Sequence, residues 1–461
     1  MKENMSMEQR LVLWVSILAS FVAFLDGSVV NVALPAIARS LGGGLATQQW
    51  VVNGYLITLG SLMLIAGSFS DIFGRKRIMS FGLIGFAITS FLCALAPNGL
   101  FLILARSLQG IAGALLVPSS LALIMSTFTG TKQSKAIGSW TAWTVIGPAI
   151  GPLIGGMLVD IASWRYIFIV TLLPIIAALW LLRSLRQPED IDTSVKVDFI
   201  GTILCAIGLG GLVYVFIEQP HFGWASPLIY LPLIAGIIAS LTFIWHEKHT
   251  TYPMLPLALF NVRNFSVGNV ATAGIYAGLS IATFMIAIFI QQVSDYTATE
   301  AGLSLLPVTI MMFALSPVFG RAAGKYGPRW FMAFGPIIGG IGFLVLLRVD
   351  QSAPYLTQLL PGILLFGLGL SMTVAPLTSA ILGSIDSRQS GIGSAINNAV
   401  ARVAGLLAIA AVGLVVGPTL TLNGFHQGLI MTAALLIAGG IVSGIGIQNP
   451  VLTTAKSASP Q

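Results

Sequence analysis

The chain has 461 residues, of which 56% are hydrophobic and only 8% are charged. About a quarter of the residues in a soluble domain are charged, so this composition excludes an ordinary water-soluble globule. Apolar runs of roughly twenty residues recur along the chain, and such runs cross a bilayer as helices because hydrocarbon offers the backbone no water. The sequence therefore predicts an all-α integral membrane protein.

Hydropathy predicts about fourteen membrane-spanning helices. The first is too long for a removable signal peptide and lacks its cleavage site. Polar segments at 182–198 and 246–264 interrupt the series. We expect an N-terminal six-helix bundle in residues 1–185, a connector with an inserted helix pair in 186–250, and a C-terminal six-helix bundle with a short tail in 251–461. The predicted spans are residues 11–37, 49–70, 78–96, 100–127, 136–159, 164–182, 199–217, 227–245, 266–290, 301–320, 330–347, 355–380, 391–415 and 426–447.

Positive charge predicts the orientation of these spans. If the N-terminus is cytoplasmic, 17 of the 22 Lys and Arg residues fall in cytoplasmic segments, three lie on the other side, and Arg106 and Arg402 lie inside spans. The positive-inside rule then places both termini in the cytoplasm. The net charge of +7 reflects this topology, and we expect no nucleic-acid partner.

Sequence signals for an enzyme or a cofactor are missing. The sequence has no P-loop, no G-x-S-x-G elbow and no Cys/His cluster. Cys93 and Cys205 lie in apolar spans without metal-ligand or disulfide spacing, and we interpret them as packing residues. We expect a protein that is not an enzyme and has no cofactor.

The turn after the second span reads GSFSDIFGRKR, residues 67–77, and GRAAGKYGPRW at 320–330 echoes its glycines and basic residue. Glycine permits a tight turn and a close approach of helices. The first turn resembles the loop between spans 2 and 3 of the major facilitator superfamily, which implies a role in conformational gating; a solvated basic turn is the alternative. The gating residues that this resemblance implies are Gly67, Asp71, Gly74 and Arg75.

Span 5 contains GPAIGPLIGG, residues 147–156, in which two prolines remove backbone donors and favour a kink. Small residues in lipid also form helix-packing faces, which is the alternative interpretation. The run resembles the antiporter signature of the same superfamily, and the resemblance implies a hinge. The residues that match are Gly147, Gly151, Pro152, Gly155 and Gly156.

Asp26 and Arg106 are charged residues inside spans 1 and 4. An ionised aspartate near mid-membrane costs about 3 kcal/mol, so a carboxyl placed there can load and release a proton. LDGSVVNVALP around Asp26 resembles the first-span signature of fourteen-span drug:proton antiporters, and Arg106 with Gln109 resembles a span 4 pattern of the superfamily. We predict a proton-coupling role for both charged residues. The alternatives are an arginine that snorkels to the headgroups and an aspartate tied permanently to polar neighbours.

The resemblance implies a monomeric antiporter in the bacterial cytoplasmic membrane that exchanges protons for lipophilic or cationic small molecules by alternating access. The substrate would bind between the two halves at mid-depth. Glu218, at the end of span 7, is expected to be solvated. A dedicated exporter of an endogenous lipid, peptide or antibiotic is the nearest alternative, and a non-transporting receptor or scaffold is a more distant one. Candidate substrate-binding residues, each of which could instead join helices, are Asn31, Asn53, Tyr55, Trp143, Tyr276, Gln291, Asn397 and Asn398.

Single cysteines at positions 190 and 423, in a chain whose Cys93 and Cys205 are replaced by serine, test the orientation. A membrane-impermeant thiol reagent added to intact cells should label position 423 and spare position 190, because the charge asymmetry places them on opposite sides. Labelling of both from the same side would contradict the fourteen-span topology.

Overall fold

The structure is a computed structural model that describes residues 5–185, 197–386 and 389–449. Most of the connector, residues 186–196, and the side chain of Asp71 lie outside the described residues. All the regular elements of the described ranges are helices. The helices are α1 (Met7–Leu41), α2 (Gly44–Phe73), α3 (Arg75–Ala94), α4 (Gly99–Thr127), α5 (Gly130–Ile161), α6 (Tyr166–Val170), α7 (Leu172–Arg183), α8 (Phe199–Phe222), α9 (Pro227–His249), α10 (Arg263–Gln292), α11 (Ala298–Ser304), α12 (Leu306–Tyr326), α13 (Arg329–Val345), α14 (Leu360–Leu382), α15 (Ser390–Val416) and α16 (Leu422–Gly446).

The fourteen predicted spans coincide with these helices. Thirteen described segments are long and apolar enough to cross a bilayer, with α6–α7 and α11–α12 each forming one of them. Helix α2 has 30 residues and supplies the remaining span. The expected all-α membrane fold is therefore confirmed.

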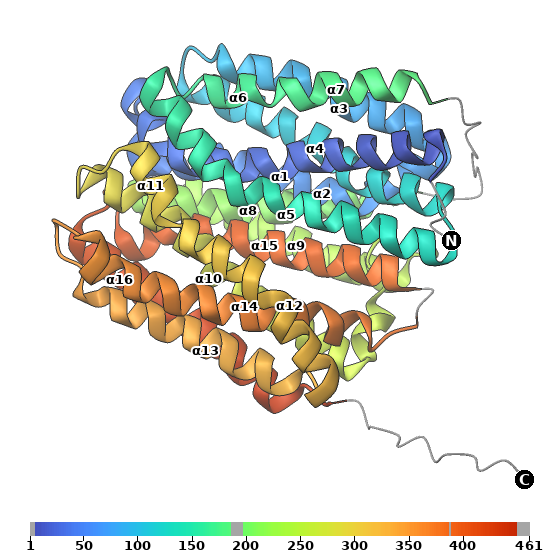
Figure 1. The fold of residues 1–461 in the computed structure, drawn as a ribbon. Coiled ribbons are helices and arrows are strands. Elements are labelled where there is room, and N and C mark those ends of the chain that lie inside the picture. The colour runs from blue at the N-terminus through green and yellow to red at the C-terminus, as the bar shows by residue number, and fades with distance from the viewer. Residues whose placement is uncertain (1–4, 186–196, 387–388, 450–461) are drawn as a thin grey trace, which may run out of the picture.

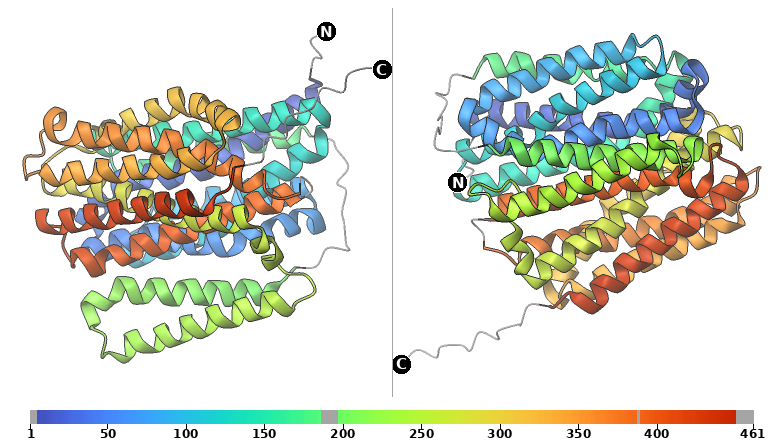
Figure 2. Two further views of the ribbon diagram at one scale, coloured as in Figure 1. Left: turned by 90° about the horizontal axis from the view of Figure 1, so that it is seen from below. Right: turned by 180° about the vertical axis from the view of Figure 1, so that it is seen from behind.

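The helices form two bundles with an added hairpin (Figure 1). Helices α1–α7 pack together in one bundle and α10–α16 in the other. The α8–α9 hairpin stands to one side of both bundles (Figure 2), where α8 packs against α2 and α15. The hairpin thus covers the line along which α2 of one bundle meets α15 of the other.

Glu218 differs from the expectation that it is solvated. Its carboxylate accepts a hydrogen bond of 2.7 Å from the indole of Trp50 on α2, and its side chain is 20% exposed. At the other end of the hairpin, His246 on α9 pairs with Asp198 before α8 at 2.8 Å. Glu218 therefore fixes the hairpin to the N-terminal bundle, a contact that its place at a helix end did not predict.

We call the end of the molecule that carries the N-terminus the inner end and the opposite end the outer end. The bundles are joined near the outer end. The Asp160 carboxylate after the α5 glycine run accepts hydrogen bonds from the backbone N–H groups of Ala298 and Thr299, at the start of α11. Gln49 on α2 donates to the Ile409 carbonyl on α15 at 2.7 Å. These bonds close the outer end.

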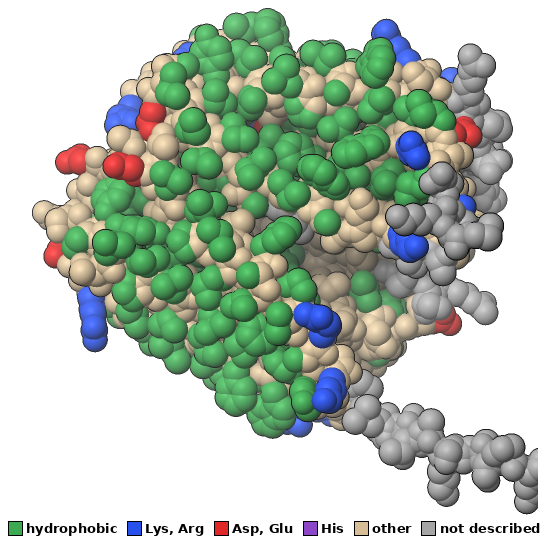
Figure 3. Space-filling view, in the orientation of Figure 1, with side chains coloured by type: hydrophobic (Ala, Val, Ile, Leu, Met, Phe, Trp, Pro, Cys, Tyr) green, Lys and Arg blue, Asp and Glu red, His purple; other side chains and the backbone are tan. Residues whose placement is uncertain are grey.

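The surface is hollowed between the two bundles toward the inner end (Figure 3). On α15 the inner residues Gly391 and Asn398 are exposed, and on α1 a Cβ added to Gly27 would meet nothing within 4 Å. Closed contacts at one end and a hollow at the other give an outer-closed, inner-open arrangement. We call this hollow the central cavity.

The outer closure depends on the absence of a side chain at Gly156. A Cβ on Gly156 would lie 2.4 Å from the Ala298 carbonyl oxygen of the opposite bundle. Gly156→Ala should therefore disfavour the outer-closed arrangement by about 1–3 kcal/mol, the usual effect of overpacking. Spin labels at exposed positions 97 and 351, on outer loops of the two bundles, should report a longer distance in this variant.

Gly138 provides the matched control on the same helix, because a Cβ there would meet nothing within 4 Å. Gly138→Ala should leave the distance between the labels unchanged. An unchanged distance in Gly156→Ala as well would show that the outer contact does not limit opening.

Candidate functional site

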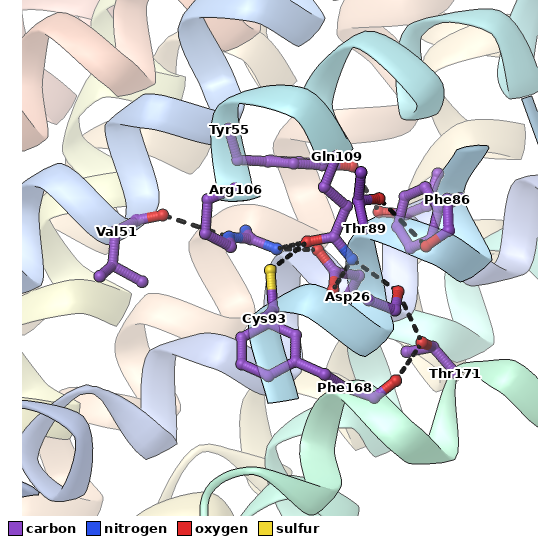
Figure 4. A network of polar contacts seen from close by, with 12 residues as sticks. Asp26, Val51, Tyr55, Phe86, Thr89, Cys93, Arg106, Gln109, Phe168 and Thr171 are labelled. Carbon is purple, nitrogen blue, oxygen red and sulfur yellow. Dashed lines mark hydrogen bonds and ion pairs between the residues drawn. The ribbon is translucent and has the colours of Figure 1, made fainter. Parts of the chain in front are cut away.

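Asp26 on α1 is fully buried inside the N-terminal bundle. Its carboxylate accepts a hydrogen bond of 2.6 Å from the Arg106 guanidinium and one of 3.2 Å from the Gln109 amide, both on α4 (Figure 4). Arg106 and Gln109 are three residues apart and therefore lie on one helix face. Two side chains of α4 thus hold the two oxygens of one carboxylate on α1.

Arg106 is 1% exposed, so the interpretation that it snorkels to the headgroups is wrong. Besides Asp26, its guanidinium donates to the Gln109 side-chain oxygen at 2.7 Å and to the Val51 carbonyl at 3.2 Å. The ring of Tyr55 lies 4.3 Å from the guanidinium carbon. The sequence left open whether the two charged residues meet, and in the structure they form a direct ion pair.

The network extends through residues that the sequence did not single out as a site. Gln109 donates to the Ser90 hydroxyl at 2.8 Å, and Thr171 donates to the same hydroxyl at 3.3 Å. The Cys93 thiol lies 3.6 Å from the Gln109 oxygen. Ser90 and Cys93 are three residues apart on α3, and both side chains project into the bundle. Hydropathy does not indicate whether a residue of a span faces the bundle or the lipid. The pair is thus surrounded by three other helices of the N-terminal bundle, α2, α3 and α6, and by Thr171 between α6 and α7.

Helix α1 presents different chemistry on its two sides. Phe24 lies two positions before Asp26, which at 3.6 residues per turn places the two side chains on nearly opposite sides of the helix. Phe24 lies 5.4 Å below the guanidinium of Arg402 on α15 of the other bundle, and Gly27 borders open space. Asp26 therefore faces the interior of its own bundle, whereas Phe24 and Gly27 face the central cavity.

The glycines of α5 lie against α1 on both sides of Asp26. A Cβ on Gly147 would lie 3.2 Å from the Leu25 nitrogen, one on Gly151 2.0 Å from the Ser28 hydroxyl, and one on Gly155 2.8 Å from the Val29 carbonyl. Pro152 lies inside the same helix, and its carbonyl meets Gly302 of α11. The run packs α1 tightly, as the alternative interpretation expected, and its hinge role stays a prediction.

The candidate substrate residues separate into different environments. Gln291 donates to the Val32 carbonyl on α1, and Asn397 donates to Asn269 and Thr272 on α10, so both join helices. Tyr55 is buried against Arg106. Gln291 and Tyr55 therefore do not contribute open polar surface in this arrangement, whereas Asn397 is partly exposed.

The other candidates are more varied. Asn53 is fully buried, and neither polar atom of its amide has a hydrogen-bond partner among the described residues. Asn398 is exposed, whereas Asn31 and Tyr276 are partly exposed. Trp143 is 40% exposed and packs against Trp14, with ring centroids 5.7 Å apart. Their roles in binding remain predictions.

The predicted gating turn joins α2 to α3. Gly74 has φ 93°, a backbone conformation that favours glycine, and allows the two helices to reverse direction within one residue. Lys76 donates to the Leu185 carbonyl at 2.5 Å, at the end of the N-terminal bundle. A Cβ added to Gly67 would meet nothing within 4 Å, and Arg75 has an interaction partner. The turn is therefore fixed to its own bundle, and its gating role remains a prediction.

Comparisons with known proteins identify a matching family, relatives of similar sequence and solved structures of similar fold. Residues 16–408 match the family model described as Major Facilitator Superfamily. The chain is 32% identical over 400 residues to the puromycin resistance protein of Streptomyces alboniger, covering 85% of this chain and 78% of that protein. It is 31% identical over 418 residues to the multidrug resistance protein Stp of Mycobacterium tuberculosis, covering 90% and 78%. A bacterial homologue of the human lysosomal transporter Spinster has the same fold, with a TM-score of 0.71, 15% identity and coverage of 96% and 98%.

Alanine at Gly155 should impair the protein more than alanine at Gly151. The new methyl group at 155 would meet a backbone carbonyl, which cannot rotate away, whereas at 151 it would meet a serine hydroxyl that can. We expect Gly155→Ala to lower the free energy of unfolding by about 1–3 kcal/mol and Gly151→Ala by less. Thermal unfolding of the purified variants measures this, with Gly138→Ala as the control. Equal midpoints for all three would contradict the close packing of α5 on α1.

Proposed function

The chain belongs to the Major Facilitator Superfamily, and from that premise we propose that it is a proton-coupled antiporter that exports lipophilic small molecules by alternating access. It is a multi-pass membrane transporter and not an enzyme. We further propose that it works as a monomer in the bacterial cytoplasmic membrane, with both termini in the cytoplasm.

The buried Asp26–Arg106 pair is the observation that carries this proposal. An ionisable pair deep in a membrane bundle is costly and marks a functional site by default. The carboxylate can accept a proton, and protonation would remove the charge that holds Arg106 at 2.6 Å. The bond between α1 and α4 would then weaken, so that proton loading changes how α1 is held.

The arrangement of the bundles supports the transport cycle. The central cavity reaches the inner end, from which a substrate would enter, while Asp160 and Gln49 contribute to the outer closure. The ion pair needs Asp26 in its charged form. A cavity open at the inner end together with a charged Asp26 fits the stage after a proton has been released and before the substrate is carried outward.

The breadth of the cargo has two candidate answers. Stp is named for multidrug resistance, whereas the puromycin resistance protein is named for one antibiotic. Broad efflux is the proposal that we favour, because the cavity belongs to a fold with a largely apolar interior. A dedicated exporter would protect cells against one compound in a growth-inhibition panel, and a broad exporter against several.

Asp26→Asn tests proton coupling directly. The amide keeps the shape of the carboxyl but cannot gain or lose a proton, so uphill efflux driven by a pH gradient should be lost. Downhill exchange of substrate should survive, since Asp26 does not border the central cavity. Both are measured in proteoliposomes, the first as substrate-stimulated proton flux.

Asp295→Asn is the matched control, because it makes the same chemical change in an exposed carboxylate on the outer loop between α10 and α11. It should retain proton-driven transport. Wild-type accumulation by Asp26→Asn under an imposed pH gradient would falsify the assignment of Asp26 as the coupling residue.

A further inference from the structure

Arg402 is a second arginine at mid-membrane, and it differs from Arg106 in having no anionic partner in the part of the chain that the structure describes. It is the thirteenth of the 27 residues of α15. Among the described residues no side chain forms an ion pair or a hydrogen bond with it, and its one specific contact is the ring of Phe24 at 5.4 Å. A charged side chain at this depth costs about 2.5–3.5 kcal/mol on insertion scales. An interaction with a bound molecule would account for its presence.

The fixed charges near the cavity leave this cation uncompensated. Of the acidic residues in the described helices, Asp26 alone lies near the middle of a span, and Arg106 neutralises it. Asp160, Glu218 and Glu247 lie at helix ends. The middle of the membrane therefore carries one net positive charge, located at the meeting of the two bundles.

Arg402 lies at the deep end of an accessible helix face. Asn398 precedes it by one helical turn and is exposed, and Arg402 itself is partly exposed. Across the cavity, Phe24 and Gly27 occupy neighbouring turns of α1, and Gly27 borders open space. A molecule that entered from the inner end would pass Asn398 before it reached the guanidinium.

Further polar groups lie on the helices that pack against α15. Tyr276 on α10 is partly exposed, and its carbonyl oxygen lies 3.9 Å from a Cβ built on Gly405 of α15, about one turn after Arg402. Asn53, with its unpartnered amide, lies on the face of α2 that meets α15, between Gln49 and Gly60. A ligand with oxygen atoms could supply the partners that the Asn53 amide lacks, because buried polar groups are rarely left unpaired.

We propose that Arg402 binds the anionic group of the exported molecule and that the cargo is a lipophilic organic anion, such as an aromatic carboxylate. This inference rests on the proposed role of the central cavity as the substrate site. A planar guanidinium offers two parallel N–H donors to a carboxylate, and the Phe24 ring offers an apolar surface to the body of the ligand. A cationic cargo, expected from the sequence, would be repelled by the same charge.

The test uses three probes with the same aromatic body: pyrenebutyrate, its primary amide and pyrenebutylamine. Binding is measured by equilibrium dialysis at neutral pH with the purified full chain in an uncharged detergent, corrected for protein-free micelles. The acid should bind most tightly and the amine most weakly. Arg402→Gln should weaken binding of the acid about tenfold or more, the usual value of a charge-assisted hydrogen bond, and should change binding of the amide little.

Two further variants separate local recognition from net charge. Arg402→Lys keeps the charge and should retain the preference for the acid. Arg348→Gln removes a positive charge from an exposed outer position and should behave like the wild type. If Arg402→Gln does not fold, the wild-type ranking still decides: equal binding of acid and amide, or a preference for the amine, overturns the proposal.

The source of the anion is tested in nanodiscs of zwitterionic or anionic lipid. Retained preference for the acid in both supports a free substrate, whereas its loss in anionic lipid assigns Arg402 to a lipid headgroup and overturns the proposal. None of these measurements requires a proton gradient. Failure of proton coupling in Asp26→Asn proteoliposomes would therefore leave the charge preference of the cavity independently measurable.

Discussion

The buried ion pair between Asp26 and Arg106 is the constraint around which the N-terminal bundle is organised. Either charge alone in this interior would be strongly unfavourable, and removing one partner of such a pair costs several kcal/mol. Gln109 and the Val51 carbonyl satisfy remaining hydrogen-bonding groups of the pair. Apolar residues of similar size would stabilise the bundle as well or better. The pair is therefore better explained by a change in its protonation than by stability.

Helix α1 connects this pair to the rest of the molecule. One side of the helix carries Asp26, another packs on the glycines of α5, and a third meets the opposite bundle through Phe24. The α5 run continues to Gly156 and Asp160, which form the outer closure. A shift of α1 would thus be felt both in the cavity and at the outer end, through helices in direct contact.

The fold was predictable from sequence because each span buries its own backbone hydrogen bonds, so hydropathy alone indicates its position. Asp26 and Arg106 were predictable for the related reason that a charge in an apolar run is costly. Their direct pairing depends on the tilt and contact of α1 and α4, which no local pattern records. Glu218 was misjudged because the position of the inserted hairpin beside Trp50 is a tertiary feature. Ser90 and Thr171 resemble ordinary helix residues until the helices are assembled.

The geometry also limits how a proton and a substrate can be exchanged. Asp26 faces away from the central cavity and is already neutralised, so a substrate cannot compete with a proton for this carboxylate by direct contact. With an anionic cargo, direct electrostatics would even favour joint binding, because protonation of Asp26 leaves Arg106 as an uncompensated cation near the site. Antiport must then arise from conformation: the proton changes how α1 is held by α4, and α1 changes which end of the cavity is open. Under the proposed function, coupling is mechanical, and Asp26 and Arg402 act on opposite sides of one helix.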